Sequence, residues 1–184
     1  IVPLYISTYG ELVLFFLGPI IKKRRESKAD VGQTPFLWVA PSDPYWGKSN
    51  SLQLRVSELL DKASTKDKKL YSPTIYLPVS GPNDQRSARQ WKREFEPNTD
   101  KLHGFIEGFL GGSVEVLHFE SEFVAVVYHV SLPQSYPVSF PVGFISADAD
   151  IVKTIGQVVN SYLSGSSGFE RPNDCGPLGR LGSV

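Results

Sequence analysis

The sequence predicts a mainly β protein, specifically an antiparallel β-sandwich with one or two short helices. Two successive stretches, residues 113–119 and 123–132, alternate with the two-residue period of a β-strand. Most other apolar segments are short and bounded by proline or glycine, as strands between turns are. Residues 151–162 have the clearest helical spacing of apolar residues. Many short strands with few helices favour two packed sheets.

The first 41 residues form a strand-rich N-terminal segment (1–41). β-Branched and aromatic residues divided by proline and glycine predict strands at residues 4–8 and 11–17. A charged loop follows, and Pro35–Pro41 predicts a short strand bounded by prolines. Residues 42–50 contain Asp-Pro and Gly, which makes them a candidate linker to a β-rich main domain at 51–163.

Residues 51–64 fit two structures, because their first half alternates like a strand and their second half has one apolar helical face. We expect a short helix that begins near Ser57, a suitable N-cap residue. A short strand is expected from Ser72. The polar residues 87–95 predict about one turn of helix.

The segment Ser113–Leu132 predicts a β-hairpin whose two faces are both mainly apolar. Gly111 and Gly112 permit a sharp turn into its first strand, and Pro133 withholds the backbone donor that would extend the second. A hairpin without a polar face must be covered on both sides. We expect a second sheet on one side and a neighbouring subunit or loops on the other.

The last part of the chain predicts a helix and then a tail. Two short apolar pieces precede the amphipathic segment 151–162, and Asp148 or Asp150 lies at its N-terminus, where the helix dipole stabilises a carboxylate. Residues 164–184 are rich in Gly, Ser and Pro, which predicts a flexible tail.

Length and composition limit the class of protein. A chain of 184 residues is most simply one domain, and its 19 basic and 19 acidic residues argue against a surface built throughout to bind nucleic acid. The single cysteine excludes an internal disulfide. The apolar run at residues 12–17 is too short to cross a bilayer, so we expect no membrane span. The lack of methionine and the opening IVPLY are typical of a segment processed from a polyprotein, or of a recombinant fragment.

The candidate chemical groups do not form a recognisable catalytic motif. If the hairpin turns at Glu120-Ser121, His118 lies opposite Phe123 and about 20 Å from His129, too far to share a metal. Asp148 and Asp150 resemble paired carboxylates, but a helix cap explains the same spacing. Cys175 has no histidine nearby in the sequence. We therefore expect no enzyme activity, no metal and no cofactor.

Two basic clusters are candidates for contact with nucleic acid. The first consists of Lys22, Lys23, Arg24 and Arg25. The second combines Trp91 with four cations, a pattern that suits a phosphate backbone and a stacked base: Arg86, Arg89, Lys92 and Arg93. Charge on a solvated loop is the alternative explanation for both.

One stretch resembles a family of viral coat proteins. Five features follow one another along this stretch. They are Phe109, the sequence Gly-Gly-Ser at 111–113, the alternating strand 114–119, a polar break that carries a phenylalanine, and a second strand closed by proline. The pattern resembles the paired second and third strands of the jelly-roll coat proteins of picornavirus-like viruses, including nepovirus-type capsids. STYGELVLFFLGPI and TPFLWVAP look like late strands of such a jelly roll.

The chain also departs from that family. Phe109-Leu110 stands where a tryptophan is common, and late-type strands precede early-type ones. This order suggests two incomplete jelly rolls joined at residues 42–50.

The resemblance implies a structural protein of an icosahedral viral capsid that self-assembles through jelly-roll-like subunits. It implies localisation to the virion and to the host cytoplasm during assembly, with other capsid subunits and packaged RNA as partners. The alternative is a cellular β-rich binding domain that recognises a protein or carbohydrate through loops such as DPYWGK. A third hypothesis, a hydrolase using His103, His129 or the Asp148/Asp150 pair, requires these groups to meet in one cleft.

Overall fold

The predicted hairpin is present and lies near the middle of a large sheet. Strand β5, Val114–Phe119, pairs antiparallel with β6, Phe123–Val130. The turn between them contains Ser121 in a left-handed conformation, with φ of 62°. Phe119 lies opposite Phe123, so His118 faces Val124, one residue away from the expected pairing.

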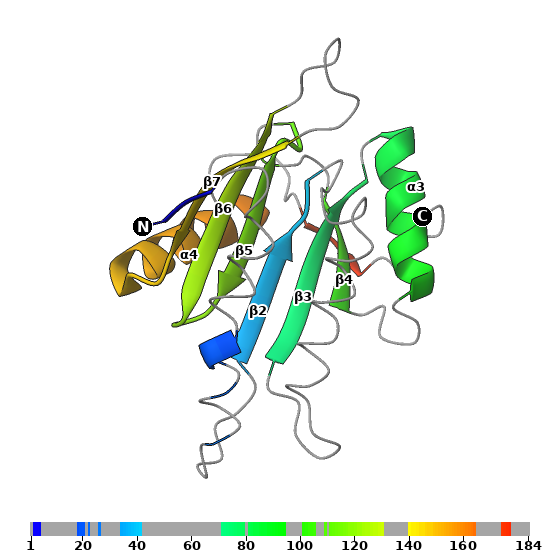
Figure 1. Cartoon of the computed structure of the whole chain (residues 1–184). Coiled ribbons are helices and arrows are strands. Elements are labelled where there is room, and N and C mark those ends of the chain that lie inside the picture. Colours follow the sequence, from blue (N-terminus) through cyan, green and yellow to red (C-terminus); the bar gives the residue numbers. More distant parts are fainter. Residues whose placement is uncertain are drawn as a thin grey trace.

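The described residues form a sheet of eight strands in the order β1-β7-β6-β5-β2-β3-β4-β8 (Figure 1). The computed structural model describes residues 2–4, 18–20, 22, 26, 34–41, 71–79, 81–94, 101–105, 109, 111–130, 140–164 and 174–177. The remaining strands are β1 Val2–Leu4, β2 Thr34–Val39, β3 Tyr71–Pro78, β4 Leu102–Phe105, β7 Phe140–Ser146 and β8 Asp174–Pro177. The long helices within these described ranges are α3, Pro82–Glu94, and α4, Ala149–Leu163.

The prediction of a mainly β fold is confirmed, whereas the antiparallel sandwich and the jelly roll are not. The described strands belong to one mixed sheet in which β2, β3 and β4 run parallel to one another and the other pairs are antiparallel. The reason lies between β3 and β4, where α3 has 13 residues and not the single turn expected. A helix of this length carries the chain back across the sheet, which is what a parallel pair requires.

Several local predictions are confirmed by the strand and helix bounds. The segments at 35–41 and from Ser72 form β2 and β3, which lie side by side although they flank the candidate linker 42–50. The helix near Ser57, the linker and residues 5–17 lie outside the described residues. Strand β4 was not predicted. Within the tail, for which flexibility is predicted, β8 pairs with the sheet edge at β4.

Helix α4 begins where its cap is expected. The Asp148 carboxylate accepts hydrogen bonds from the backbone N–H groups of Asp150 and Ile151, both at 3.1 Å. This capping satisfies two of the donors that every helix N-terminus leaves without an intrahelical acceptor. The buried side of the helix carries Val152, Val159 and Leu163.

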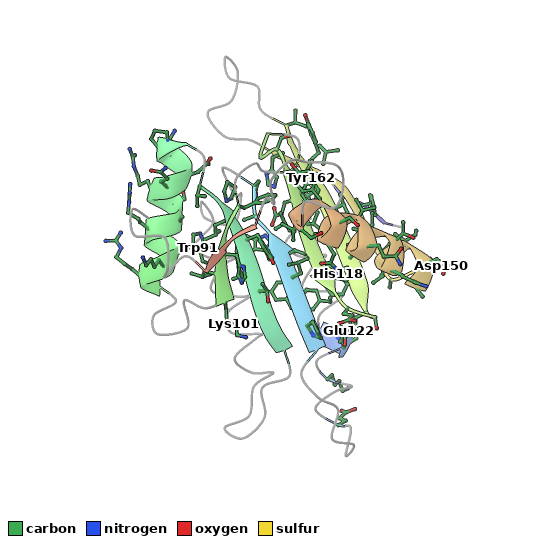
Figure 2. The ribbon with its side chains drawn as sticks, turned by 180° about the vertical axis from the view of Figure 1, so that it is seen from behind. Trp91, Lys101, His118, Glu122, Asp150 and Tyr162 are labelled. Carbon is green, nitrogen blue, oxygen red and sulfur yellow. The ribbon has the colours of Figure 1, made fainter. Side chains whose placement is uncertain are left out.

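The two helices pack on opposite faces of the sheet. Val152, Val159 and Leu163 of α4 contact a core that includes Val39 and Val116, and we call this side of the sheet the α4 face. Trp38, which precedes Val39 and points the other way, meets Trp91 of α3 edge to face with ring centroids 5.1 Å apart. We call that side the α3 face. Figure 1 shows α4 behind the strands, and Figure 2, which is drawn from the opposite side, shows it in front of them.

The hairpin is covered on both faces, but not equally. On the α3 face, Phe123, Ala125 and Val127 are fully buried. On the α4 face Val124 is fully buried, whereas Tyr128 remains 45% exposed. No helix among the described residues is long and apolar enough to span a membrane.

The close pairing of β6 and β7 depends on Gly143. A Cβ atom at this position would lie 2.0 Å from the carbonyl oxygen of Val126 and 2.8 Å from the Cα of Val127. Both are backbone atoms, so a side chain at residue 143 requires the two strands to separate.

We predict that Gly143→Ala lowers the free energy of unfolding by about 2–4 kcal/mol, because overpacking against backbone forces a local shift of the sheet. Urea denaturation monitored by circular dichroism measures this change. The matched control is Val142→Ala on the same strand, where the native side chain is 43% exposed and the expected loss is below about 1 kcal/mol. Equal stability of the two variants would contradict the β6–β7 register.

Candidate functional site

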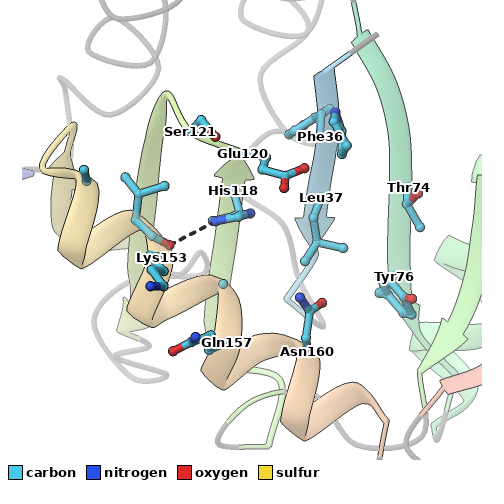
Figure 3. A pocket seen from close by; sticks show the side chains of 14 residues that line it. Phe36, Leu37, Thr74, Tyr76, His118, Glu120, Ser121, Lys153, Gln157 and Asn160 are labelled. Carbon is cyan, nitrogen blue, oxygen red and sulfur yellow. Dashed lines mark hydrogen bonds between the residues drawn. The ribbon is translucent and has the colours of Figure 1, made fainter. Parts of the chain in front are cut away.

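A pocket of about 650 Å³ lies on the α4 face, between α4 and the strands that this helix leaves uncovered (Figure 3). Its walls come from β2, β3, the end of β5, the β5–β6 turn and α4. The lining residues are Pro35, Phe36, Leu37, Thr74, Tyr76, His118, Glu120, Ser121, Ala149, Val152, Lys153, Gly156, Gln157 and Asn160.

The floor of the pocket is a row of side chains across three strands. Leu37 of β2 is paired with Thr74 of β3 on one side and with His118 of β5 on the other. Paired residues of neighbouring strands project from the same face, so these three side chains lie next to one another. Tyr76, two residues beyond Thr74, extends the same face and adds an aromatic ring. The floor is therefore partly apolar and partly polar.

The opposite wall is a polar stripe along α4. Lys153, Gln157 and Asn160 are four and three residues apart, which places them on one side of the helix. All three are exposed and line the pocket, and Figure 3 shows Asn160 pointing toward Leu37. Each amide side chain offers both a donor and an acceptor to a ligand.

His118 joins the floor of the pocket to α4. Its Nε2 lies 3.0 Å from the carbonyl oxygen of Val152, drawn as a dashed line in Figure 3. Because the carbonyl can only accept, Nε2 carries the hydrogen, and Nδ1 of the neutral ring is then an acceptor. The ring fits there because Gly156 has no side chain: a Cβ atom would lie 2.7 Å from Nε2. His118 is thereby held in one orientation at the edge of the pocket.

The turn between β5 and β6 closes one end of the pocket. It contributes Glu120 and Ser121, and the backbone N–H of Glu120 donates to the carbonyl oxygen of Pro35 at 3.3 Å. This bond ties the turn to β2. The carboxylate of Glu120 and the ammonium group of Lys153 give the lining one charge of each sign, so it has no strong preference for an anion or a cation.

A second polar group is buried on the α3 face. Glu115 is completely buried, accepts a hydrogen bond from Trp38 Nε1 at 2.8 Å, and lies 2.7 Å from His129 Nε2. The second ring nitrogen of His129, Nδ1, is buried and has no hydrogen-bond partner in the described part of the chain. Both carboxylate oxygens of Glu115 are therefore used inside the sheet, which indicates a structural role for this cluster.

The groups considered for catalysis do not converge. His129 lies on the α3 face and His118 on the α4 face, so the two side chains project from opposite sides of the sheet. His103 contacts Tyr76, with ring centroids 4.9 Å apart, and Asp148 caps α4. No three His, Cys, Asp or Glu residues within the described ranges are placed to hold a metal ion. The hydrolase hypothesis required these groups to share a cleft, and they do not.

The two basic clusters have different positions relative to the described structure. Lys22 is exposed, whereas Lys23, Arg24 and Arg25 lie outside the described residues. The second cluster lies on α3, where Trp91 turns toward Trp38 and is therefore not presented for stacking on a base. Cys175 lies in β8.

Sequence reasoning missed the polar residues of the pocket. Lys153, Gln157 and Asn160 look like the ordinary solvated side of an amphipathic helix, and only the neighbouring strands turn them into a wall. Glu115 was also missed, although one acidic residue inside an apolar strand is a signal that the sequence does contain.

Comparisons of the sequence with protein-family models and with curated proteins find no match, so the function is inferred here from geometry.

We predict that Glu115→Ala lowers the free energy of unfolding by about 3–5 kcal/mol, because it leaves the Trp38 N–H and the His129 ring buried without their acceptor. Glu115→Gln should cost less, since the amide oxygen still accepts from Trp38. Urea titration of both variants measures the difference. The control is Glu120→Ala, at an exposed carboxylate, which should stay within about 0.5 kcal/mol of the parent. A wild-type midpoint for Glu115→Ala would contradict the buried network.

Proposed function

We propose that the protein is a binding domain whose α4-face pocket holds a polar, uncharged ligand of the carbohydrate class. In this proposal the protein does no covalent chemistry on the ligand. The observation that carries the proposal is the pocket itself, which combines an aromatic and aliphatic floor with a rim of amide and hydroxyl groups.

The size and the chemistry of the pocket support this ligand class. Sites for small ligands usually have volumes of about 300–1,000 Å³ and a few converging polar groups on a mainly apolar lining. A sugar has apolar C–H faces that suit Leu37 and Tyr76, and hydroxyl groups that both donate and accept. Gln157 and Asn160 have the matching dual capacity. The opposite charges of Lys153 and Glu120 give no reason to favour a charged ligand.

The test is a nuclear magnetic resonance titration of the full chain with chitobiose, maltose and cellobiose. We expect at least one disaccharide to shift backbone signals of residues 74–76 and 153–160, with a dissociation constant of about 1 mM, equivalent to about −4 kcal/mol. Gln157→Ala with Asn160→Ala should weaken binding about 30-fold, since each hydrogen bond contributes about 1 kcal/mol.

The matched control is Thr154→Ala, on the exposed side of α4 and outside the pocket lining, which should bind like the parent. The proposal fails if none of the three sugars shifts these signals, or if the shifts map to residues outside the pocket and do not change in the double variant.

The second candidate function is assembly into a capsid, as a structural protein whose partners are further subunits. One observation favours self-association: Tyr128 and Val142, register partners on β6 and β7, are 45% and 43% exposed. Val114, opposite Tyr128 on β5, extends this apolar row. The jelly-roll form of this proposal requires a second sheet built from residues outside the described ranges. Virion localisation and contact with packaged RNA through Lys22, Lys23, Arg24 and Arg25 belong to the same proposal.

For this second candidate we predict a species that sediments much faster than a monomer and that Tyr128→Glu dissociates. A charge placed in an apolar contact costs several kcal/mol at each copy of the interface. Sedimentation velocity at about 10–100 µM measures the effect, because assembly depends on concentration. Val158→Glu, which changes a 55% exposed residue outside the row, is the control. A monomer throughout this range contradicts the capsid proposal and leaves the pocket proposal unaffected.

A further inference from the structure

Helix α3 has a side that anchors it to the protein and a side that carries arginines. On the inner side Ala88 is completely buried, Trp91 meets Trp38, and Gln85 Nε2 donates to the carbonyl oxygen of Val79 at 3.2 Å. These contacts fix how the helix is rotated about its axis. The remaining side of α3 is therefore presented to solvent in a defined orientation.

The outer side carries Arg86, Arg89 and Arg93, all exposed, on one strip of the helix. They are three and four residues apart, and Arg86 and Arg93 lie one above the other, about 10.5 Å apart along the axis. Figure 2 shows the nitrogen-tipped side chains of α3 pointing away from the sheet. We call these three residues the arginine strip.

The strip is a local excess of positive charge on a chain whose net charge is zero. Helix α3 contains four basic residues against Asp84 and Glu94, which gives a net charge of +2. Within the described part of the chain, neither Arg86 nor Arg93 makes an ion pair or a hydrogen bond. Their guanidinium groups are thus available to an external anion.

We infer that the arginine strip binds the phosphate backbone of a nucleic acid. Guanidinium groups match phosphate oxygens with paired hydrogen bonds, and arginine suits this recognition better than lysine. The length of the strip, about 10.5 Å, equals the axial length of about three phosphates on one strand of a duplex. Three successive phosphates are therefore within reach of three arginines.

The apolar residues of α3 determine the class of partner. A helix that binds a membrane surface needs an exposed apolar face, but Ala88 and Trp91 are turned into the protein. Among the α3 side chains that the structure describes, the exposed ones are Pro82, Asn83 and the strip. The same orientation removes Trp91 from base stacking. Binding should therefore be independent of base sequence, weak and strongly dependent on salt.

This site is independent of the proposed ligand pocket. The strip lies on the α3 side of the sheet and the pocket on the α4 face, so the two sites do not compete for the same residues. Failure of one proposal leaves the other intact.

The experiment measures fluorescence anisotropy of a labelled RNA of about 20 nucleotides, as single strand and as duplex, titrated with the full chain at about 50–200 mM NaCl. We expect log Kd to rise with log salt with a slope of about 2, close to 0.7 for each of three phosphates. Arg86→Gln with Arg93→Gln should weaken binding about 10-fold and lower the slope by about 1.4. Glutamine has nearly the helix propensity of arginine, so circular dichroism should not change.

The control is Lys101→Gln, which removes one charge outside α3 and outside the pocket lining and should change affinity less than about 2-fold. Trp91→Phe should bind like the parent. The inference is overturned if Lys101→Gln loses as much affinity as the arginine variant, if the arginine variant loses none, or if a second RNA of different base sequence is bound much more tightly. It is also overturned if phosphatidylserine vesicles bind the chain and RNA does not.

Discussion

Burial of both faces of the β5–β6 hairpin is the constraint on which the rest of the structure depends. A β-strand exposes alternate side chains on opposite faces, and here both sets are mainly apolar. Leaving either set in water would cost about 25 cal/mol for each Å² of apolar surface. The hairpin must therefore lie inside the sheet and be covered on both sides. Strands β2 and β7 flank it, and α4 covers the face that carries Val116 and Val124.

Because α4 covers the hairpin but not all of the neighbouring strands, its position creates the candidate pocket. The buried side of the helix lies on the hairpin and on Val39, and the helix does not extend over Thr74 and the nearby part of Leu37. The hydrogen bond from His118 to Val152 fixes the distance between helix and sheet at this boundary. A polar wall and a partly apolar floor then face each other. The same packing that stabilises the core thus produces a concave surface.

The α3 face has a different organisation, because a charged residue lies among its aromatic side chains. Phe36, Phe119 and Phe123 stack in sequence, with ring centroids 4.2 and 4.6 Å apart. Glu115 lies four residues before Phe119 on β5 and faces the same side of the sheet. Its two carboxylate oxygens interact with Trp38 and His129. A buried carboxylate with directional partners restricts which strand registers are acceptable, since a shift of one residue would turn it to the other face. Trp38 also holds Trp91, so the network fixes the orientation of α3.

Local patterns in the sequence determined those strands and the helix whose apolar residues repeat over a few positions along the chain. The two-residue alternation fixed β5 and β6, proline and β-branched residues marked β2 and β3, and Asp148 with the apolar spacing of 151–162 defined α4. Each of these depends on residues within about two turns or one strand of each other, so neighbours along the chain suffice to specify them.

Only the tertiary structure decided the parallel order β2-β3-β4, the full length of α3 and the lining of the pocket. Helix α3 has few apolar residues, so its sequence gives no continuous apolar stripe, and its contacts with the sheet stabilise the helix. Leu37, Thr74 and His118 become neighbours through hydrogen bonds between strands that are distant in sequence. Such a register results from packing of the whole sheet and leaves no local periodicity, which is why the sequence by itself determined β2, β3, β5 and β6 and the tertiary structure determined the site.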